Sequence, residues 1–202
     1  MAPPVAALAP RAVIFDLDGT LTEPLLDFDA MRAEIGLPAR VPILEQLERL
    51  TAAERARAEA ILLRHERAAI AQATLAEGCA DLLGHLRGQA IPFAILTRNV
   101  REVVDTFARM FSFRFHAIYT REDGPPKPSP AGALSLCRAM GVDPAHTLAV
   151  GDYKYDVIAG RDAGCRTALV RPVALAAHEL SEWGSPDLIV KSLRELLPLF
   201  AR

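Results

Sequence analysis

Short runs of apolar residues alternate along the chain with segments in which apolar residues recur at helical spacing. The runs are bounded by turn or capping residues and lie near residues 11–16, 91–97, 115–120, 147–151, 166–170 and 187–190. Helical spacing is clear near 99–110, 129–140 and 154–163, and Gly141 and Gly164 follow the last two as helix stops. This alternation predicts an α/β fold with a buried, mostly parallel sheet.

An insertion separates the first two predicted strands. The stretch from residue 23 to about 76 has helical character throughout and is much longer than an ordinary crossover connection. Its main helix is predicted to begin at Thr51, which has the spacing of a capping box with Glu54, and to continue to Gly78. We therefore expect an inserted helical subdomain over residues 23–76. The α/β core domain is expected to comprise residues 1–22 and 77–202.

Composition excludes several classes of partner. The chain has 202 residues, of which 51% are hydrophobic and 24% charged, so it can bury a core. Its formal net charge of -2 lacks the basic excess that binds nucleic acid or anionic lipid. No apolar run approaches the roughly 20 residues that a membrane span requires. We expect no nucleic acid and no membrane as partner, and a monomer or homodimer.

The N-terminal segment and the cysteines indicate the compartment. Residues 1–10 are apolar, but prolines interrupt them and no basic residue precedes Arg11, which is unlike a signal peptide. The three cysteines are far apart and form no Cys-x-x-Cys pair that would suggest a disulfide framework or a zinc site. We therefore predict a cytoplasmic protein with three free thiols, Cys79, Cys137 and Cys165.

Two aspartates directly follow the first apolar run. The sequence FDLDGTLT places Asp16 and Asp18 where an open α/β sheet exposes the carboxyl ends of its strands to ligand. Taken alone, this segment also fits a turn in which aspartates cap backbone amides. Phosphoryl transfer gives both acids a role, since Asp16 can attack phosphorus and Asp18 can protonate the leaving oxygen and later deprotonate water. Gly19 would permit the sharp turn that brings both to one site.

Further polar side chains follow other predicted strands. Thr97 ends the second run, and its hydroxyl and the amides of Arg98 and Asn99 can hold a phosphate oxygen, although an N-cap role also fits Thr97 alone. Asp152 ends the fourth run, and Asp156 lies about one helical turn later. Such carboxylates suit a hard cation held by oxygen ligands, so we expect magnesium rather than zinc.

One lysine stands in a stiff loop of a chain that is poor in lysine. Of the 23 basic residues only three are lysines, and Lys127 lies among four prolines in GPPKPSP. A solvated loop lysine is the plainer interpretation. However, a site with several carboxylates and a phosphate needs a fixed positive charge, and this favours a functional Lys127.

These motifs, in this order, resemble the haloacid dehalogenase superfamily of hydrolases, and most closely its phosphoglycolate phosphatase-like and β-phosphoglucomutase-like members. The matching segments are Asp16-Leu17-Asp18, Thr97, Lys127-Pro128 and Gly151-Asp152-x-x-x-Asp156. The resemblance implies a Rossmann-like core with the insertion as a mobile helical cap. It also implies a Mg2+-dependent phosphatase that hydrolyses a small phosphorylated metabolite through an aspartyl-phosphate.

The resemblance also assigns roles to single residues. Asp16 becomes nucleophile and metal ligand, and Asp18 becomes the general acid/base that also offers its backbone carbonyl to the metal. Asp152 completes the metal site, and Asp156 joins it directly or through water.

The resemblance also assigns phosphate binding to a second set of residues. Thr97 and Lys127 are expected to bind phosphate and to take part in catalysis. Asn99 matches a position that often contacts phosphate through its backbone. Arg98, between Thr97 and Asn99, is a variation on the family pattern, and we group it with the substrate-binding residues.

Related activities remain as alternatives. A dehalogenase does not need Asp18, and a phosphonatase needs a cap lysine, which residues 23–76 lack. A phosphomutase would share every core residue and differ only in shielding the aspartyl-phosphate from water, so it is the alternative function. From a different class, an inactive phosphate-binding regulatory module is disfavoured because all the acids and Lys127 are retained.

Overall fold

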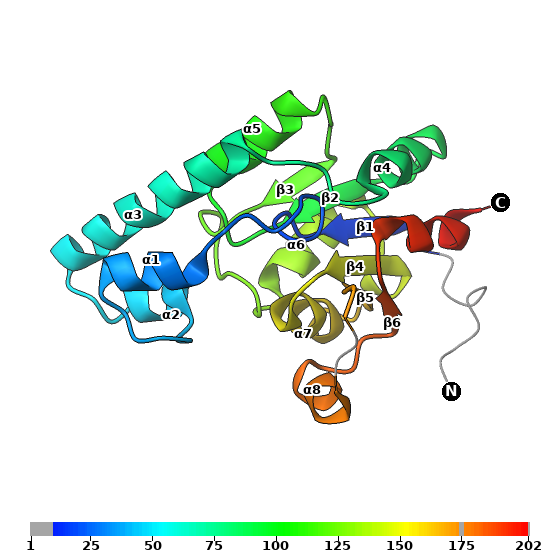
Figure 1. The fold of residues 1–202 in the computed structure, drawn as a ribbon. Helices are drawn as coiled ribbons and strands as arrows, with labels where there is room; N and C mark the ends of the chain where they lie inside the picture. Colours follow the sequence, from blue (N-terminus) through cyan, green and yellow to red (C-terminus); the bar gives the residue numbers. More distant parts are fainter. Residues whose placement is uncertain (1–9, 174–175, 202) are drawn as a thin grey trace. The chain divides into compact units, whose positions relative to one another are not determined.

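Figure 1 shows a computed structural model of the chain, which describes residues 10–173 and 176–201. The chain forms two compact units. The inserted unit is Leu25–Ala73, and the core unit comprises the chain up to Pro24 and from Thr74 onward. Within the described residues, no helix is both long and apolar enough to cross a membrane.

A parallel sheet of six strands forms the centre of the core unit, in the order β3-β2-β1-β4-β5-β6. All neighbouring strands pair in parallel. The strands are β1 (Ala12–Phe15), β2 (Phe93–Leu96), β3 (Ala117–Tyr119), β4 (Thr147–Gly151), β5 (Arg166–Val170) and β6 (Leu188–Val190). The predicted α/β fold class with a mostly parallel sheet is confirmed. Strand order reverses direction between β1 and β4, the point at which open α/β sheets bind ligands.

Helices cover both faces of this sheet, with α4 and α5 on one face and α6 and α7 on the other (Figure 1). The helices of the core unit are α4 (Cys79–Gly88), α5 (Arg101–Met110), α6 (Ala131–Met140), α7 (Lys154–Asp162) and α8 (Ala177–Glu182), with 3-10 segments η2 (Pro144–His146) and η3 (Leu193–Phe200). Leu136 and Cys137 of α6 join Ile14, Ala94 and Leu96 of the sheet in one buried cluster. Burial of such side chains, at about 25 cal/mol per Å² of apolar surface, holds the helices on the sheet.

The inserted unit has a small hydrophobic core of its own. Its helices are α1 (Phe28–Ile35), α2 (Ile43–Leu47) and α3 (Ala52–Ala71). The core consists of Met31, Ile43, Leu47, Ala58 and Leu62, with further leucines and Ile35 packed around it. The segment is therefore helical in three pieces rather than throughout, and Gly36 ends α1 in the left-handed conformation at φ 85°.

The main helix of the insertion begins as predicted and ends earlier. Thr51 Oγ1 accepts the amide of Glu54, and the Glu54 carboxylate accepts the amide of Thr51, so the capping box is confirmed. The predicted continuation to Gly78 is wrong, because α3 ends at Ala71. A turn follows Ala71, and Leu75 then forms a β-bridge, a backbone conformation that is incompatible with a helix.

That pairing joins the two segments that flank the inserted unit. Thr22 and Leu75 form an antiparallel bridge. The Glu23 amide donates to Thr74 O at 3.0 Å, and the Ala76 amide donates to Leu21 O at 3.0 Å. Both flanking segments belong to the core unit, so the chain leaves and re-enters the core unit at neighbouring points.

Candidate active site

The carboxyl ends of β1, β2 and β4 carry the polar side chains that the sequence analysis singled out. Asp16 follows β1, Thr97 follows β2 and Asp152 follows β4. The Asp16 amide donates to Val150 O at 2.9 Å, which extends the pairing of β1 with β4 as far as this residue. Since the three strands are adjacent and parallel, the residues that follow them lie at the same edge of the sheet.

Three carboxylates meet at this edge. One oxygen each of Asp16, Asp152 and Asp156 lies within 4.8 Å of the others. Asp156 stands in the first turn of α7, and its Oδ2 accepts the amide of Tyr153 at 3.0 Å. Gly151 leaves the room that this carboxylate fills, because a Cβ there would lie 2.1 Å from Asp156 Cγ. Clustered carboxylate oxygens are hard ligands whose repulsion a cation relieves, so the cluster fits a divalent metal.

Lys127 places a positive charge inside the acid cluster. Its Nζ lies 2.6 Å from Asp16 Oδ1 and 2.5 Å from Asp156 Oδ1, and its side chain is only 3% exposed. Burial lowers the pKa of Lys127, but the charges of Asp156 and Asp16 outweigh burial and raise this pKa overall. The interpretation of Lys127 as a solvated loop lysine is therefore wrong.

Burial also raises the pKa values of the clustered acids. For Asp16, burial raises the pKa, Lys127 opposes the rise, and the charges of Asp156 and Asp152 add to it. For Asp152, burial and then the charge of Asp156 raise the pKa to about 7. Without a cation, the cluster therefore binds protons more readily than isolated aspartates do.

Asp18 lies on a tight turn directly after Asp16. Leu17 O accepts the amides of Leu21 and Thr22 at 2.9 and 3.1 Å, which closes the turn, and Gly19 adopts φ 77° within it. The Asn99 side-chain amide donates a hydrogen bond to Asp18 Oδ2.

The protonation of Asp18 follows from these surroundings. Burial raises the pKa of Asp18, and this outweighs the opposing effects of the Asn99 hydrogen bond and the Lys127 charge. A raised pKa favours the protonated form, which a general acid requires.

Thr97 does not cap the helix that follows it. The N-cap of α5 is Val100, so the N-cap interpretation of Thr97 is wrong. Thr97 is 2% exposed, and its hydroxyl oxygen accepts the amide of Asn99 at 3.2 Å. The loop between β2 and α5 therefore holds this hydroxyl at the edge that also carries Asp16.

Two side-chain contacts of the site were not foreseen from the sequence. Asn99 was assigned a backbone contact only, whereas its side chain binds Asp18. Arg98 is predicted to bind substrate, whereas its Nη1 donates to Lys127 O at 2.6 Å. Both bonds join segments far apart in the chain, and no local sequence pattern carries a signal for them.

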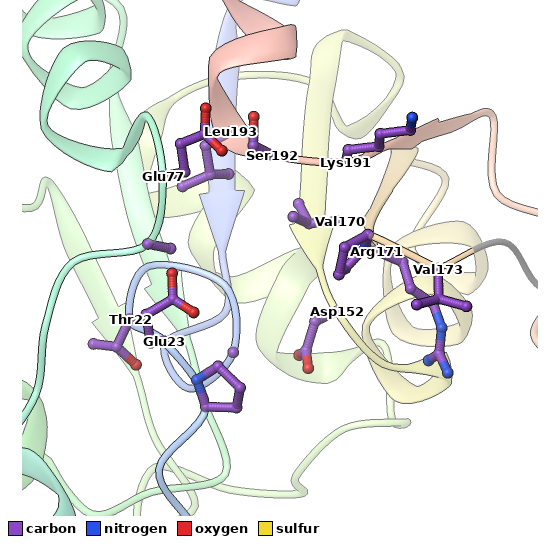
Figure 2. A pocket seen from close by; sticks show the side chains of 14 residues that line it. Thr22, Glu23, Glu77, Asp152, Val170, Arg171, Val173, Lys191, Ser192 and Leu193 are labelled. Carbon is purple, nitrogen blue, oxygen red and sulfur yellow. The ribbon is translucent and has the colours of Figure 1, made fainter.

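A cavity of about 430 Å³ opens beside Asp152 within the core unit (Figure 2). Its walls combine the segments that flank the inserted unit with the residues that follow β4, β5 and β6. The lining residues include Glu23, Glu77, Asp152, Val170, Arg171, Val173, Lys191, Ser192 and Leu193. This volume lies in the range of small-molecule sites.

Comparison with known proteins decides the family. The family model described as haloacid dehalogenase-like hydrolase matches residues 28–164. The chain belongs to the haloacid dehalogenase-like hydrolases. The resemblance and the enzyme class predicted from the motifs are confirmed. The matched range includes Thr97, Lys127, Asp152 and Asp156, and Asp16 precedes it.

Known haloacid dehalogenase-like relatives match almost the whole chain. A phosphoglycolate phosphatase of Chromobacterium violaceum is 30% identical, over 94% of this chain and 96% of its own. An N-acetylmuramic acid 6-phosphate phosphatase of Pseudomonas putida is 32% identical, over 92% of this chain and 94% of its own. The crystal structure of a hydrolase from Pseudomonas syringae has the same fold, with a TM-score of 0.78 at 20% identity, covering 93% of this chain and 96% of that one.

Proposed function

We propose that this hydrolase is a magnesium-dependent phosphatase that cleaves a small phosphomonoester through an aspartyl-phosphate on Asp16. The observation that carries the proposal is the position of Lys127, whose ammonium group lies between Asp16 and Asp156 at the switch point of the sheet. A carboxylate can attack an anionic phosphate only where positive charge offsets their repulsion. The similarity to two phosphatases supports a phosphate ester as substrate.

The proposed reaction has two steps. In the first, a carboxylate oxygen of Asp16 bonds to phosphorus, the bond from phosphorus to the leaving oxygen breaks, and Asp18 gives that oxygen its proton. In the second, Asp18 takes a proton from water, the water oxygen bonds to phosphorus, and the bond from phosphorus to the Asp16 oxygen breaks, which frees the Asp16 carboxylate and inorganic phosphate. Asp18 must start protonated, and its raised pKa is consistent with this.

The remaining residues hold the phosphate and the cation. Thr97 and Lys127, with the backbone amides of Arg98 and Asn99, are proposed to bind phosphate oxygens. Mg2+ would be held by the cluster of Asp16, Asp152 and Asp156 and by the carbonyl of Asp18. Bound there, the cation would screen the charge of the phosphate from that of the carboxylates.

The proposed substrates are small phosphorylated carboxylic acids. The names of both phosphatase relatives denote phosphorylated acids. The wall of the cavity beside Asp152 also carries Glu23 and Glu77, so a substrate carboxylate is proposed to lie on the side of Arg171 and Lys191, whose charges suit it. A screen should therefore show higher kcat/KM for phosphorylated acids than for neutral phosphorylated alcohols of equal size.

The inserted unit is proposed to act as a mobile cap that selects the substrate. It is a compact unit with its own core, and its two flanking segments are paired with each other. Closure of a cap excludes water and completes many active sites. Hydrogen exchange in α1 and α3 should slow when magnesium and vanadate, a phosphate analogue, are added. Unchanged exchange in both helices would argue against a cap.

Release of inorganic phosphate tests the proposed activity. Turnover should stop in excess chelator and return when magnesium is restored. Activity that persists in chelator would contradict the metal requirement. Conversion of the substrate to an isomeric phosphate without release of inorganic phosphate would identify a phosphomutase instead.

A further inference from the structure

Arg98 joins its own loop to a second loop and to the first turn of α7 at the active-site edge. It lies in the loop after β2, between Thr97 and Asn99. Its Nη1 donates to the backbone carbonyl of Lys127 at 2.6 Å. Its guanidinium carbon also lies 4.8 Å from the ring centroid of Tyr155, which stands between Asp152 and Asp156 in the sequence. One side chain thus contacts both the loop that carries Lys127 and the first turn of α7.

The backbone of Arg98 is anchored as well. Its carbonyl accepts a hydrogen bond from Arg121 Nη1 at 2.9 Å. The amide of Arg121 donates in turn to Asn99 O at 3.2 Å, and the amide of Thr97 donates to Tyr119 O at 3.0 Å. The backbone of residues 97–99 is therefore held in place, so the Arg98 guanidinium can fix the positions of Lys127 O and the Tyr155 ring.

The geometry suits arginine in particular. A planar guanidinium can donate a hydrogen bond in its plane while its face stacks on an aromatic ring, and a lysine ammonium cannot reproduce both contacts together. A hydrogen bond from a charged donor is stronger than one between neutral groups. A cation over the face of an aromatic ring is also attracted by that ring.

The partners of Arg98 are the elements that need accurate placement. Lys127 Nζ contacts Asp16 and Asp156 at 2.6 and 2.5 Å, so a small shift of its loop would break both contacts. Asp156 and Tyr155 are neighbours on α7. Because Arg98 contacts both Lys127 O and the Tyr155 ring, it holds Lys127 and the neighbouring Asp156 at a constant separation.

We propose that Arg98 is a positioning residue that acts on catalysis through Lys127 and the first turn of α7. This inference rests on the proposed phosphatase function for its kinetic consequences only. It differs from direct substrate binding, since it assigns the effect of Arg98 to kcat rather than to KM.

The kinetic test compares two arginines of the same segment. Arg98→Lys should lower kcat about 10- to 100-fold with KM little changed, because misplacement by about 1 Å costs that much. Arg101→Lys is the matched control: its Nη2 also donates to a backbone carbonyl, that of Ile118 at 3.1 Å, and to Asp123 Oδ2 at 2.8 Å, and neither contact is made with Lys127 itself. This control should keep the kcat of the unaltered enzyme. A raised KM at unchanged kcat for Arg98→Lys, or an equal loss in both variants, would overturn the proposal.

A double-mutant cycle tests the contact with α7. Tyr155→Leu should also lower kcat, and combining it with Arg98→Lys should cost less than the product of the two single losses, because both remove one link. Losses that simply multiply would show that Tyr155 and Arg98 act independently, against the proposal.

Hydrogen exchange provides a readout that does not depend on activity. The amide of Ser129 donates to Pro126 O at 3.0 Å in the loop that Arg98 holds. Arg98→Lys should accelerate exchange at Ser129, and Arg101→Lys should not. Unchanged exchange would overturn the proposal whatever the kinetics show. If the unaltered protein hydrolysed no phosphate ester, the proposed function would fail, and this exchange experiment would still decide the positioning role.

Discussion

Gly19 faces the carboxylate of Asp152 so closely that a Cβ atom at residue 19 would lie 2.4 Å from Asp152 Oδ2. Gly19→Ala should therefore push Asp152 out of the acid cluster. Loss of a contact that orients a metal ligand typically costs about 10- to 100-fold in metal affinity, and we expect at least that loss for magnesium when Asp152 is displaced. Calorimetric titration of magnesium measures the affinity directly.

Gly36→Ala provides the control for backbone strain. Gly36 adopts φ 85°, close to the 77° of Gly19, but apart from its chain neighbours no described residue has a heavy atom within 4 Å of a Cβ built there. Both variants should lose about 1–2 kcal/mol of unfolding free energy from the left-handed conformation. Only Gly19→Ala should weaken magnesium binding. Equal weakening in both variants would mean that strain, rather than the contact with Asp152, is responsible.

Lys127→Met should abolish most of the activity. The variant keeps an unbranched side chain one atom shorter and removes the charge between Asp16 and Asp156. Loss of one preorganised charged donor costs about 100- to 1,000-fold in kcat. Lys154→Met, which removes a lysine from the start of α7, should keep near-normal kinetics. Comparable kcat values for the two variants would refute the role of Lys127.

Asp16→Asn and Asp18→Asn should behave differently. An amide at residue 16 cannot form the acyl phosphate, so Asp16→Asn should remove both turnover and covalent phosphate. Asp18→Asn keeps the nucleophile, and an activated aryl phosphate should still phosphorylate Asp16. The second step should then slow about 100- to 10,000-fold, so mass spectrometry should detect trapped phosphate on Asp16. Phosphate found on Asp18 would reverse the assignment.

The stability of the metal-free protein should fall as the pH rises through about 7. The pKa of Asp152 is about 7 in the folded protein, against 3.8 for an ordinary aspartate, because of burial and the charge of Asp156. A group with a raised folded pKa binds its proton more tightly in the folded state. The stability that this proton contributes is therefore fully present below the pKa of the unfolded chain, and it is lost as the pH rises through the pKa of the folded protein.

Thermal unfolding in chelator measures this effect. The midpoint should decrease between about pH 5 and about pH 8, and Asp152→Asn should reduce the decrease, since an amide does not titrate. The increase in the midpoint that added magnesium causes should become larger as the pH rises, because the cation binds the ionised carboxylate. A midpoint that rises with pH in chelator, and to the same degree in the variant, would contradict the prediction.

Local pattern predicted most of the fold and the positions of the key acids. Apolar runs located all six strands, and parallel pairing brings the residues after β1 and β4 to one edge wherever the chain runs in between. This is why the sequence predicts that Asp16 and Asp152 lie close together, as their carboxylate oxygens do within 4.8 Å. The position of Lys127 follows from chemistry rather than from local pattern. The clustered acids need a positive charge, and the chain has only three lysines.

The errors arose where tertiary contacts override local preference. Residues 72–76 continue a helical pattern, yet the pairing of Leu75 with Thr22 ends α3 at Ala71. Thr97 has the residue type of an N-cap, but the loop continues to Val100. Helix α4 was not predicted, because its ten residues follow directly on the insertion pattern.

The pairing of the two segments beside the inserted unit makes the core unit independent of the length of the insertion. Since Leu21 and Ala76 are hydrogen-bonded neighbours, a much shorter connection between them would preserve the strand order and the register of the sheet. The inserted unit is in this sense an exchangeable module. A change in its length or surface would leave the residues after β1 and β4 in place, because the pairing of the flanking segments does not depend on what connects them.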